Sequence, residues 1–128
     1  MFKLAACVFL GSGLGGVARY LTSVWMGKYL DANTVVGIFP WPTLAVNVAG
    51  CLLIGLVYGW VDGGTVHLSE EAKTFMTAGI CGGLTTFSTF THENYLLFQS
   101  HNFGVVLVYA AVSLLLGFAA AWVGHQLA

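Results

Sequence analysis

The chain has 128 residues and a formal net charge of −1, and its composition is far from that of a water-soluble domain. Hydrophobic residues make up 58% of it and charged residues only 7%, against roughly 25% charged residues in soluble domains. Its mean hydropathy is +0.85. So few charges exclude a soluble enzyme and a nucleic-acid-binding module, and they predict a multi-pass protein of the lipid bilayer.

The length allows about four helices of ~20 residues in a single transmembrane domain, 1–128. We expect an all-α fold with helices over about 3–26, 43–61, 70–98 and 103–124. The first segment resembles a signal peptide at its start, but it continues too far and has Arg19 where small residues would mark a cleavage site. We therefore expect a retained helix.

The first helix contains Gly11-Ser12-Gly13-Leu14-Gly15-Gly16, which matches the dinucleotide-binding fingerprint G-x-G-x-x-G. A nucleotide site of that kind needs further βαβ units, for which this chain has no soluble remainder. The small residues Gly11, Ser12, Gly15 and Gly16 instead share one helix face, where another helix can approach closely.

Two polar residues interrupt the apolar helices. Arg19 lies inside the first helix and is either a structural anchor that reaches the interface or a residue that attracts anions. Asn47 lies inside the second helix and must find a partner in lipid, either on another helix or along a pore. The residues alone leave both pairs of alternatives open.

The third expected helix, 70–98, begins with the N-cap sequence Ser69-Glu70-Glu71 and is too long for one upright span of ~20 residues. It contains Gly82-Gly83-Leu84-Thr85-Thr86, where glycines disfavour helix by about 1 kcal/mol each. We therefore expect a break near 82–86. Broken backbone is tolerated in a membrane only where it is buried in protein or lines a wet cavity, so this segment is the predicted functional centre.

Aromatic and hydroxyl side chains follow the expected break. Phe87 and Phe90 share a helix face, with Ser88 and Thr89 beside them, and Glu93 lies one turn further on. On the last helix, Tyr109 and Ser113 are one turn apart. Their hydroxyls either bond across a helix contact or form a polar track beside a pore.

His92-Glu93 does not extend to the zinc motif H-E-x-x-H, because position 96 is Leu96. Cys7, Cys51 and Cys81 are expected to be small buried hydrophobes.

Positive charge does not favour one orientation of the chain. Lys3 and Lys73 lie toward one side of the membrane, and Lys28 and Arg19 toward the other. We therefore expect insertion in both orientations and an antiparallel homodimer with two-fold symmetry, in which two broken helices cross and a small cation binds their carbonyl oxygens.

The stretch G-G-L-T-T-F-S-T-F at 82–90, with G-x-x-x-G-x-x-A-R-Y at 11–20 and T-x-x-x-N-x-x-G at 43–50, resembles the Fluc (CrcB) family of bacterial fluoride channels. The resemblance covers all four expected helices. It implies a dual-topology dimer in the bacterial inner membrane, with two pores that export cytoplasmic fluoride passively, and no enzymatic activity.

The resemblance also implies roles for individual residues. Phe87 and Phe90 would line the pores with their ring edges, Asn47 and Thr43 would lie at the pore entrance, and Gly82 and Thr85 would bind a central structural Na⁺ through backbone carbonyls. The remaining residues implied or expected along the fluoride pathway are Ser88, Thr89, Tyr109, Ser113, Arg19 and Glu93.

The main alternative is a small multidrug resistance type exporter, which has a similar length and topology. Such a proton-coupled carrier needs a carboxylate within the membrane, and the first helix has none. A third class, an assembly subunit without transport activity, would give the hydroxyl-rich broken helix no purpose.

Overall fold

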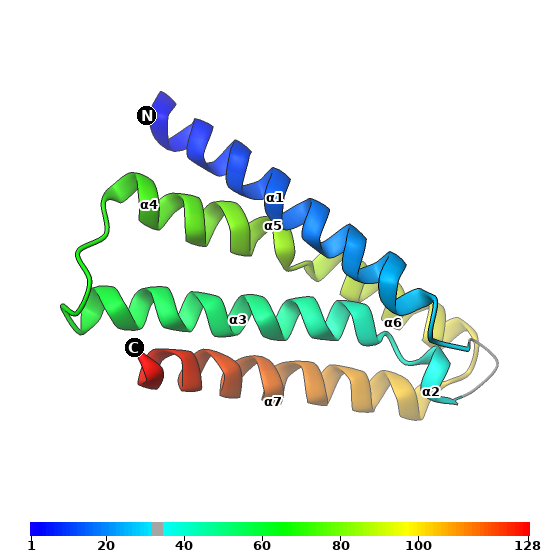
Figure 1. Cartoon of the computed structure of the whole chain (residues 1–128). Coiled ribbons are helices and arrows are strands. Elements are labelled where there is room, and N and C mark those ends of the chain that lie inside the picture. The colour runs from blue at the N-terminus through cyan, green and yellow to red at the C-terminus, as the bar shows by residue number, and fades with distance from the viewer. Residues whose placement is uncertain (32–34) are drawn as a thin grey trace.

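The computed structural model describes residues 1–31 and 35–128, and within these ranges the regular structure is helical throughout. The three long helices are α1 (Phe2–Gly27), α3 (Trp41–Asp62) and α7 (Phe103–Leu127), while α2 (Val35–Ile38) is a short helix before α3. Figure 1 shows α3 and α7 side by side and α1 inclined to them. The predicted all-α class is confirmed.

The three long helices have the length and composition of membrane spans. They contain 26, 22 and 25 residues with segment hydropathies of 1.4, 2.0 and 2.3. A helix of 22 residues is about 33 Å long at 1.5 Å per residue, enough to cross the ~30 Å hydrocarbon layer. Only 11%, 33% and 6% of these spans is buried within the chain, so most of their apolar surface faces outward. The chain is therefore a multi-pass membrane protein.

The segment expected as the third helix is divided into several elements. The N-cap prediction is confirmed, because the Ser69 side chain accepts a hydrogen bond of 3.1 Å from the Ala72 amide. After α4 (Glu70–Thr74) the chain continues as the π-helix η1 (Phe75–Cys81), a feature without a signal in the sequence, and as the short helix α5 (Gly82–Leu84). Helix α6 (Phe87–Gln99) then leads toward α7.

The interruption between α5 and α6 consists of Thr85 and Thr86. Both residues are extended, with φ/ψ of −84°/154° and −150°/121° respectively. Gly82 keeps helical angles of −63° and −38°, so within the expected range 82–86 the glycines stay helical and the threonines carry the break. Gly83 is needed for a different reason, which is helix packing.

Helix α1 crosses η1 and α5 with backbone against backbone. A Cβ added to Gly11 would lie 2.6 Å from the carbonyl oxygen of Phe75, and one on Gly15 would overlap the carbonyl oxygen of Ile80. On the opposite side, a Cβ on Gly83 would overlap the backbone of α1. Gly11 and Gly15 of the predicted small-residue face therefore form a close contact between helices, and Gly79 and Gly83 belong to its other half, whereas a Cβ on Gly16 would have no neighbour within 4 Å.

We expect Gly15→Val to separate α1 from α5, because the added side chain has only backbone atoms to displace. Overpacking of this kind costs about 1–3 kcal/mol. Gly13→Val is the matched control, since a Cβ there would have no neighbour within 4 Å. The apparent melting temperature of purified protein in detergent should fall for Gly15→Val alone. Equal melting temperatures for the two variants would contradict this packing.

Helices α3 and α7 lie side by side and run in the same direction (Figure 1). Their contact also depends on glycines, since a Cβ on Gly55 would overlap the carbonyl of Ala121. At their C-terminal ends, His125 Nε2 lies 3.3 Å from Asp62 Oδ2. At the other end, the buried residues Leu44, Leu97 and Tyr109 form a core shared by α3, α6 and α7.

The connections lie at two ends of the bundle. Figure 1 places both termini and the loop before α4 at one end, and α2 and the turn between α6 and α7 at the other. The break at Thr85 and Thr86 therefore lies along the length of the bundle, between α1 on one side and α3 on the other.

Candidate functional site

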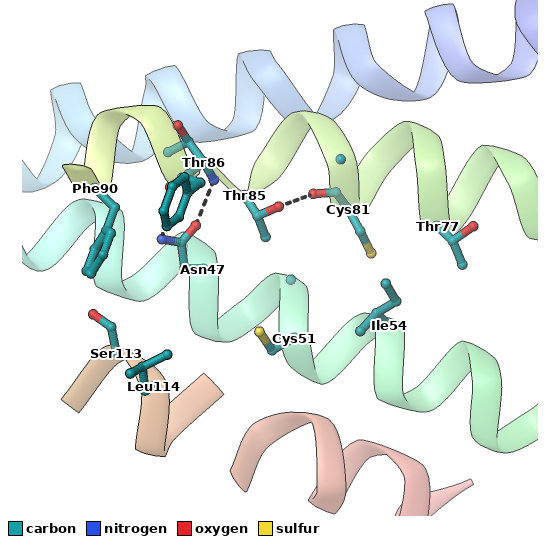
Figure 2. A pocket seen from close by; sticks show the side chains of 13 residues that line it. Asn47, Cys51, Ile54, Thr77, Cys81, Thr85, Thr86, Phe90, Ser113 and Leu114 are labelled. Atoms are coloured by element: carbon teal, nitrogen blue, oxygen red, sulfur yellow. Dashed lines mark hydrogen bonds between the residues drawn. The ribbon is translucent and has the colours of Figure 1, made fainter. Parts of the chain in front are cut away.

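Asn47 holds the break from the neighbouring helix. Its Oδ1 accepts a 2.8 Å hydrogen bond from the Thr86 amide, and its Nδ2 donates one of 3.3 Å to the Thr86 carbonyl (Figure 2). A single amide side chain thus satisfies both backbone groups of an extended residue. Of the two interpretations of Asn47, the contact between helices is shown, while a role along a pathway stays a prediction.

The break also removes the helical donors of the carbonyl groups before it, including those of Gly82 and Thr85. In a continuous helix the Thr86 amide would donate to Gly82, but here it donates to Asn47. The Thr89 amide would donate to Thr85, but it donates instead to the Thr86 hydroxyl at 3.2 Å, which makes Thr86 the N-cap of α6. The Gly82 and Thr85 carbonyls are therefore among the oxygens that the break releases for other partners, as a cation site would need.

Arg19 bonds to another of these carbonyls. Its Nε donates a 3.2 Å hydrogen bond to the carbonyl oxygen of Gly83, in the last turn of α5. A carbonyl in that turn has no helical donor, so the guanidinium replaces it and adds positive charge at a helix C-terminus. Arg19 thus has a structural contact in this fold, whereas its effect on an anion stays a prediction.

An open pocket of about 410 Å³ lies beside the break. It brings together six of the predicted residues with side chains from α3, η1 and α7: Asn47, Gly82, Thr85, Phe87, Phe90 and Ser113, accompanied by Gly50, Cys51, Ile54, Thr77, Cys81, Thr86 and Leu114. Figure 2 shows these groups around one space. None of the side chains that line it is charged.

The two phenylalanines differ in their surroundings. Their ring centroids are 6.0 Å apart, and the Phe90 ring also packs against Tyr109 at 4.9 Å. Phe87 is 79% exposed in the single chain although it lines the pocket. The pocket is thus closed on the Phe90 side by side chains of this chain, while its Phe87 side is exposed.

Thr43, Glu93 and Tyr109 form a separate polar cluster beside the pocket. The Tyr109 hydroxyl donates a 3.0 Å hydrogen bond to Glu93 Oε1, and the Thr43 side chain lies within hydrogen-bonding reach of both. Tyr109 is 0% exposed and Thr43 is 5% exposed. The predicted turn-apart pair on α7 therefore has different roles: Tyr109 is bonded to Glu93, and Ser113 faces the pocket.

The Ser113 hydroxyl is buried, and among the described residues no hydrogen-bond partner accompanies it. It lines the pocket, so it is available to a ligand there. Ser88 is exposed, and its hydroxyl is 3.5 Å from that of Thr86. Thr89 is half-buried on α6. The pocket does not include Ser88 or Thr89, whose ligand roles stay predictions.

Some contacts at the site were missed by sequence reasoning. The Gly83 carbonyl accepts from Arg19, and Thr77 lines the pocket while donating to the Lys73 carbonyl at 2.9 Å. An Arg within an apolar helix does signal a need for acceptors, but spacing alone cannot identify a backbone oxygen far along the chain. Cys51 and Cys81 are free thiols that also line the pocket.

Comparisons with known proteins agree on the family. A family model described as "CrcB-like protein, Camphor Resistance (CrcB)" matches residues 6–125. The chain is 42% identical over 117 residues to the "Fluoride-specific ion channel FluC" of Flavobacterium psychrophilum, covering 91% of this chain and 90% of the relative. Proteins of the same name from Bacteroides fragilis and Thermus thermophilus are 39% and 41% identical over 120 residues, covering 94% of this chain and 91% and 89% of theirs. The chain therefore belongs to the CrcB-like family.

Proposed function

We propose that this protein is a fluoride-selective channel through which cytoplasmic fluoride leaves the cell passively, across the bacterial inner membrane. The observation that carries the proposal is the uncharged pocket at the break, where Phe87, Phe90, Asn47 and the unpartnered Ser113 hydroxyl converge. Relatives at up to 42% identity bear the name of a fluoride-specific ion channel, which supports the same function.

The chemistry of the pocket suits a small, strongly hydrated anion. Such an ion enters only if close donors replace its water, and Asn47 Nδ2, the Ser113 hydroxyl and the positive edges of the Phe rings are donors of that kind. A fixed cation in the pocket would bind the anion too tightly for release. Arg19 does not line the pocket and donates to the Gly83 carbonyl.

Fluoride efflux from liposomes tests the proposal directly. Purified protein is reconstituted into vesicles loaded with potassium fluoride, and a fluoride electrode records release after a potassium ionophore is added. We expect rapid release that needs no proton gradient. Release that stops when a proton gradient is collapsed would instead indicate a coupled exporter of the multidrug type.

We further propose that two chains assemble as an antiparallel homodimer, with four membrane-crossing segments in each chain and the third broken, and with two pores. Phe87 is 79% exposed beside an open pocket, as expected if a second subunit completes the wall. Lys3 is near the N-terminus, which lies at the same end of the bundle as the loop before α4, and Lys28 lies at the opposite end (Figure 1). Positive charge therefore does not favour either orientation of the chain in the membrane.

Dual insertion predicts that both orientations occur in cells. Because both ends of the bundle carry similar positive charge, a periplasmic and a cytoplasmic reporter fused after Ala128 should each give signal. Adding three Lys residues at the C-terminus is the control, and it should shift the signal to the cytoplasmic reporter. Signal from one reporter alone in the unmodified fusion would exclude the antiparallel arrangement.

A structural Na⁺ at the dimer axis is the proposed partner of the released carbonyls. Gly82 and Thr85 fit the group, because the amides that would have bonded to them donate to Asn47 and Thr86 instead. Four carbonyl oxygens, two from each chain, would surround a hard cation, which would neutralise their partial negative charges. Replacing Na⁺ in the buffer by N-methylglucamine should lower the melting temperature of the dimer. An unchanged melting temperature after this replacement would argue against a bound Na⁺.

A further inference from the structure

Aromatic rings connect the pocket to the segment before α3. From Phe90 the contacts pass to Tyr109 at 4.9 Å between centroids, from Tyr109 to Phe39 at 5.3 Å, and from Phe39 to Trp41 at 4.6 Å. The Phe39 and Tyr109 rings meet edge to face at an interplanar angle of 69°. Phe39 belongs to none of the motifs considered above, and it does not line the pocket.

The backbone fixes the position of Phe39. Pro40 has φ −77° and ψ 67°, and the Trp41 amide donates a 2.8 Å hydrogen bond to the Phe39 carbonyl across it. These values describe an inverse γ-turn, in which the proline ring restricts φ. Pro42 follows at the start of α3, so the chain has little freedom to move the Phe39 ring away from Tyr109.

Tyr109 lies between Phe39 and the Phe90 ring of the pocket. Its ring is 0% exposed and packs against both Phe39 and Phe90, while its hydroxyl donates to Glu93. A ring with neighbours on two sides and a bonded hydroxyl has one orientation available. Without Phe39, the ring can tilt toward the vacated space, and Phe90 then loses the support behind it.

We propose that Phe39 is a positioning residue of the fluoride pathway, which acts through Tyr109 to hold the Phe90 edge against the pocket. The inference rests on the proposed function and adds to it a residue outside the pocket. It predicts that the aromatic ring at position 39, rather than its bulk, sets the rate of fluoride passage.

The test compares Phe39→Leu with Phe39→Tyr and with the control Phe98→Leu. Phe98 also makes an edge-to-face aromatic contact, with Phe103 at 5.2 Å, but its partner is remote from the pocket. Since an aromatic pair contributes about 0.5–1.5 kcal/mol, Phe39→Leu should lower the fluoride efflux rate between about twofold and tenfold. Phe39→Tyr and Phe98→Leu should conduct at the unmodified rate.

A double-mutant cycle separates positioning from general packing. If Phe39 acts through Tyr109, then Phe39→Leu should cause little further loss of flux in a Tyr109→Leu background. Additive losses would overturn the inference, as would an unchanged rate in Phe39→Leu. If Phe39→Leu does not elute as a folded protein, Phe39→Tyr is compared with Phe39→Met, which replaces the ring by an unbranched apolar side chain. Equal fluoride flux for these two variants would also overturn the inference.

Fluoride release from the unmodified protein distinguishes failure of the proposed function from failure of the role assigned to Phe39. No fluoride release from unmodified protein would refute the proposed function. Release from unmodified protein together with full activity of the Phe39 variants would refute only the role assigned to Phe39.

Discussion

Phe90→Ile is expected to reduce fluoride efflux to the rate of protein-free liposomes. Ile is apolar and of similar bulk, so the packing beside Tyr109 is largely kept, but it has no ring edge with positive partial charge. The Phe90 ring lines the pocket with one side supported by Tyr109 at 4.9 Å. Removing the edge therefore removes the electrostatic contact that replaces water around the ion, while the protein stays folded.

Phe87→Ile should have the same effect, and an exposed aromatic elsewhere provides the control. Phe87 is 79% exposed and Phe9, on α1, is 78% exposed, so the same substitution at Phe9 removes a ring of matched exposure far from the pocket. Efflux should be normal for Phe9→Ile. Normal efflux in a folded Phe87→Ile or Phe90→Ile protein would falsify the ring-edge mechanism.

Asn47→Leu should be the most destabilising of the single substitutions within the break. It removes both hydrogen bonds to Thr86 and leaves that residue's amide unpaired in a region that lipid cannot solvate, whereas the Thr86 carbonyl, as the N-cap of α6, keeps its helical donor. A buried unpaired amide costs about 1–3 kcal/mol, which is a large fraction of the stability of a small protein. We expect poor recovery of folded protein and a lower melting temperature in detergent.

Two variants make this result interpretable. Asn94→Leu is the same chemical change on α6, where the side chain donates one 3.0 Å hydrogen bond to the Phe90 carbonyl within its own helix, and it should cost much less. Asn47→Asp keeps the acceptor for the Thr86 amide but loses the donor, so its stability should fall between those of Asn47→Leu and the unmodified protein. If Asn47→Leu melts at the unmodified temperature, the side chain does not hold the break.

Much of the fold follows from local properties of the sequence. Hydropathy and length are enough to predict the spans α1, α3 and α7, and the glycine spacing in α1 is enough to predict its contact face. The Ser69 cap is equally local, because its partner Ala72 is three residues away. Such features depend on neighbours within one helix, which a single sequence displays.

The details of the site depend on contacts between distant residues. Whether the helix stops at Gly82 or at Thr85 depends on the Asn47 side chain, which lies on another helix and pairs with Thr86. Helix propensity placed the weakness at the glycines, but Gly82 and Gly83 both lie within helix α5, and Gly83 packs against the backbone of α1. The hydrogen bond from Arg19 to the Gly83 carbonyl and the contact of Phe39 with Tyr109 also join distant residues, and neither leaves a periodic signal in the sequence.

The π-helix η1 makes the length of its segment as important as its composition. Each π turn takes in about one more residue than an α turn, and one residue corresponds to about 100° of rotation around the axis. Helix α4, with its acidic first turn, is therefore offset in rotation from α5 and the threonines that follow. Loss of one residue between Phe75 and Cys81 would restore an ordinary α-helix and turn Thr86 away from Asn47, so an apparently harmless shortening would misalign every group at the break.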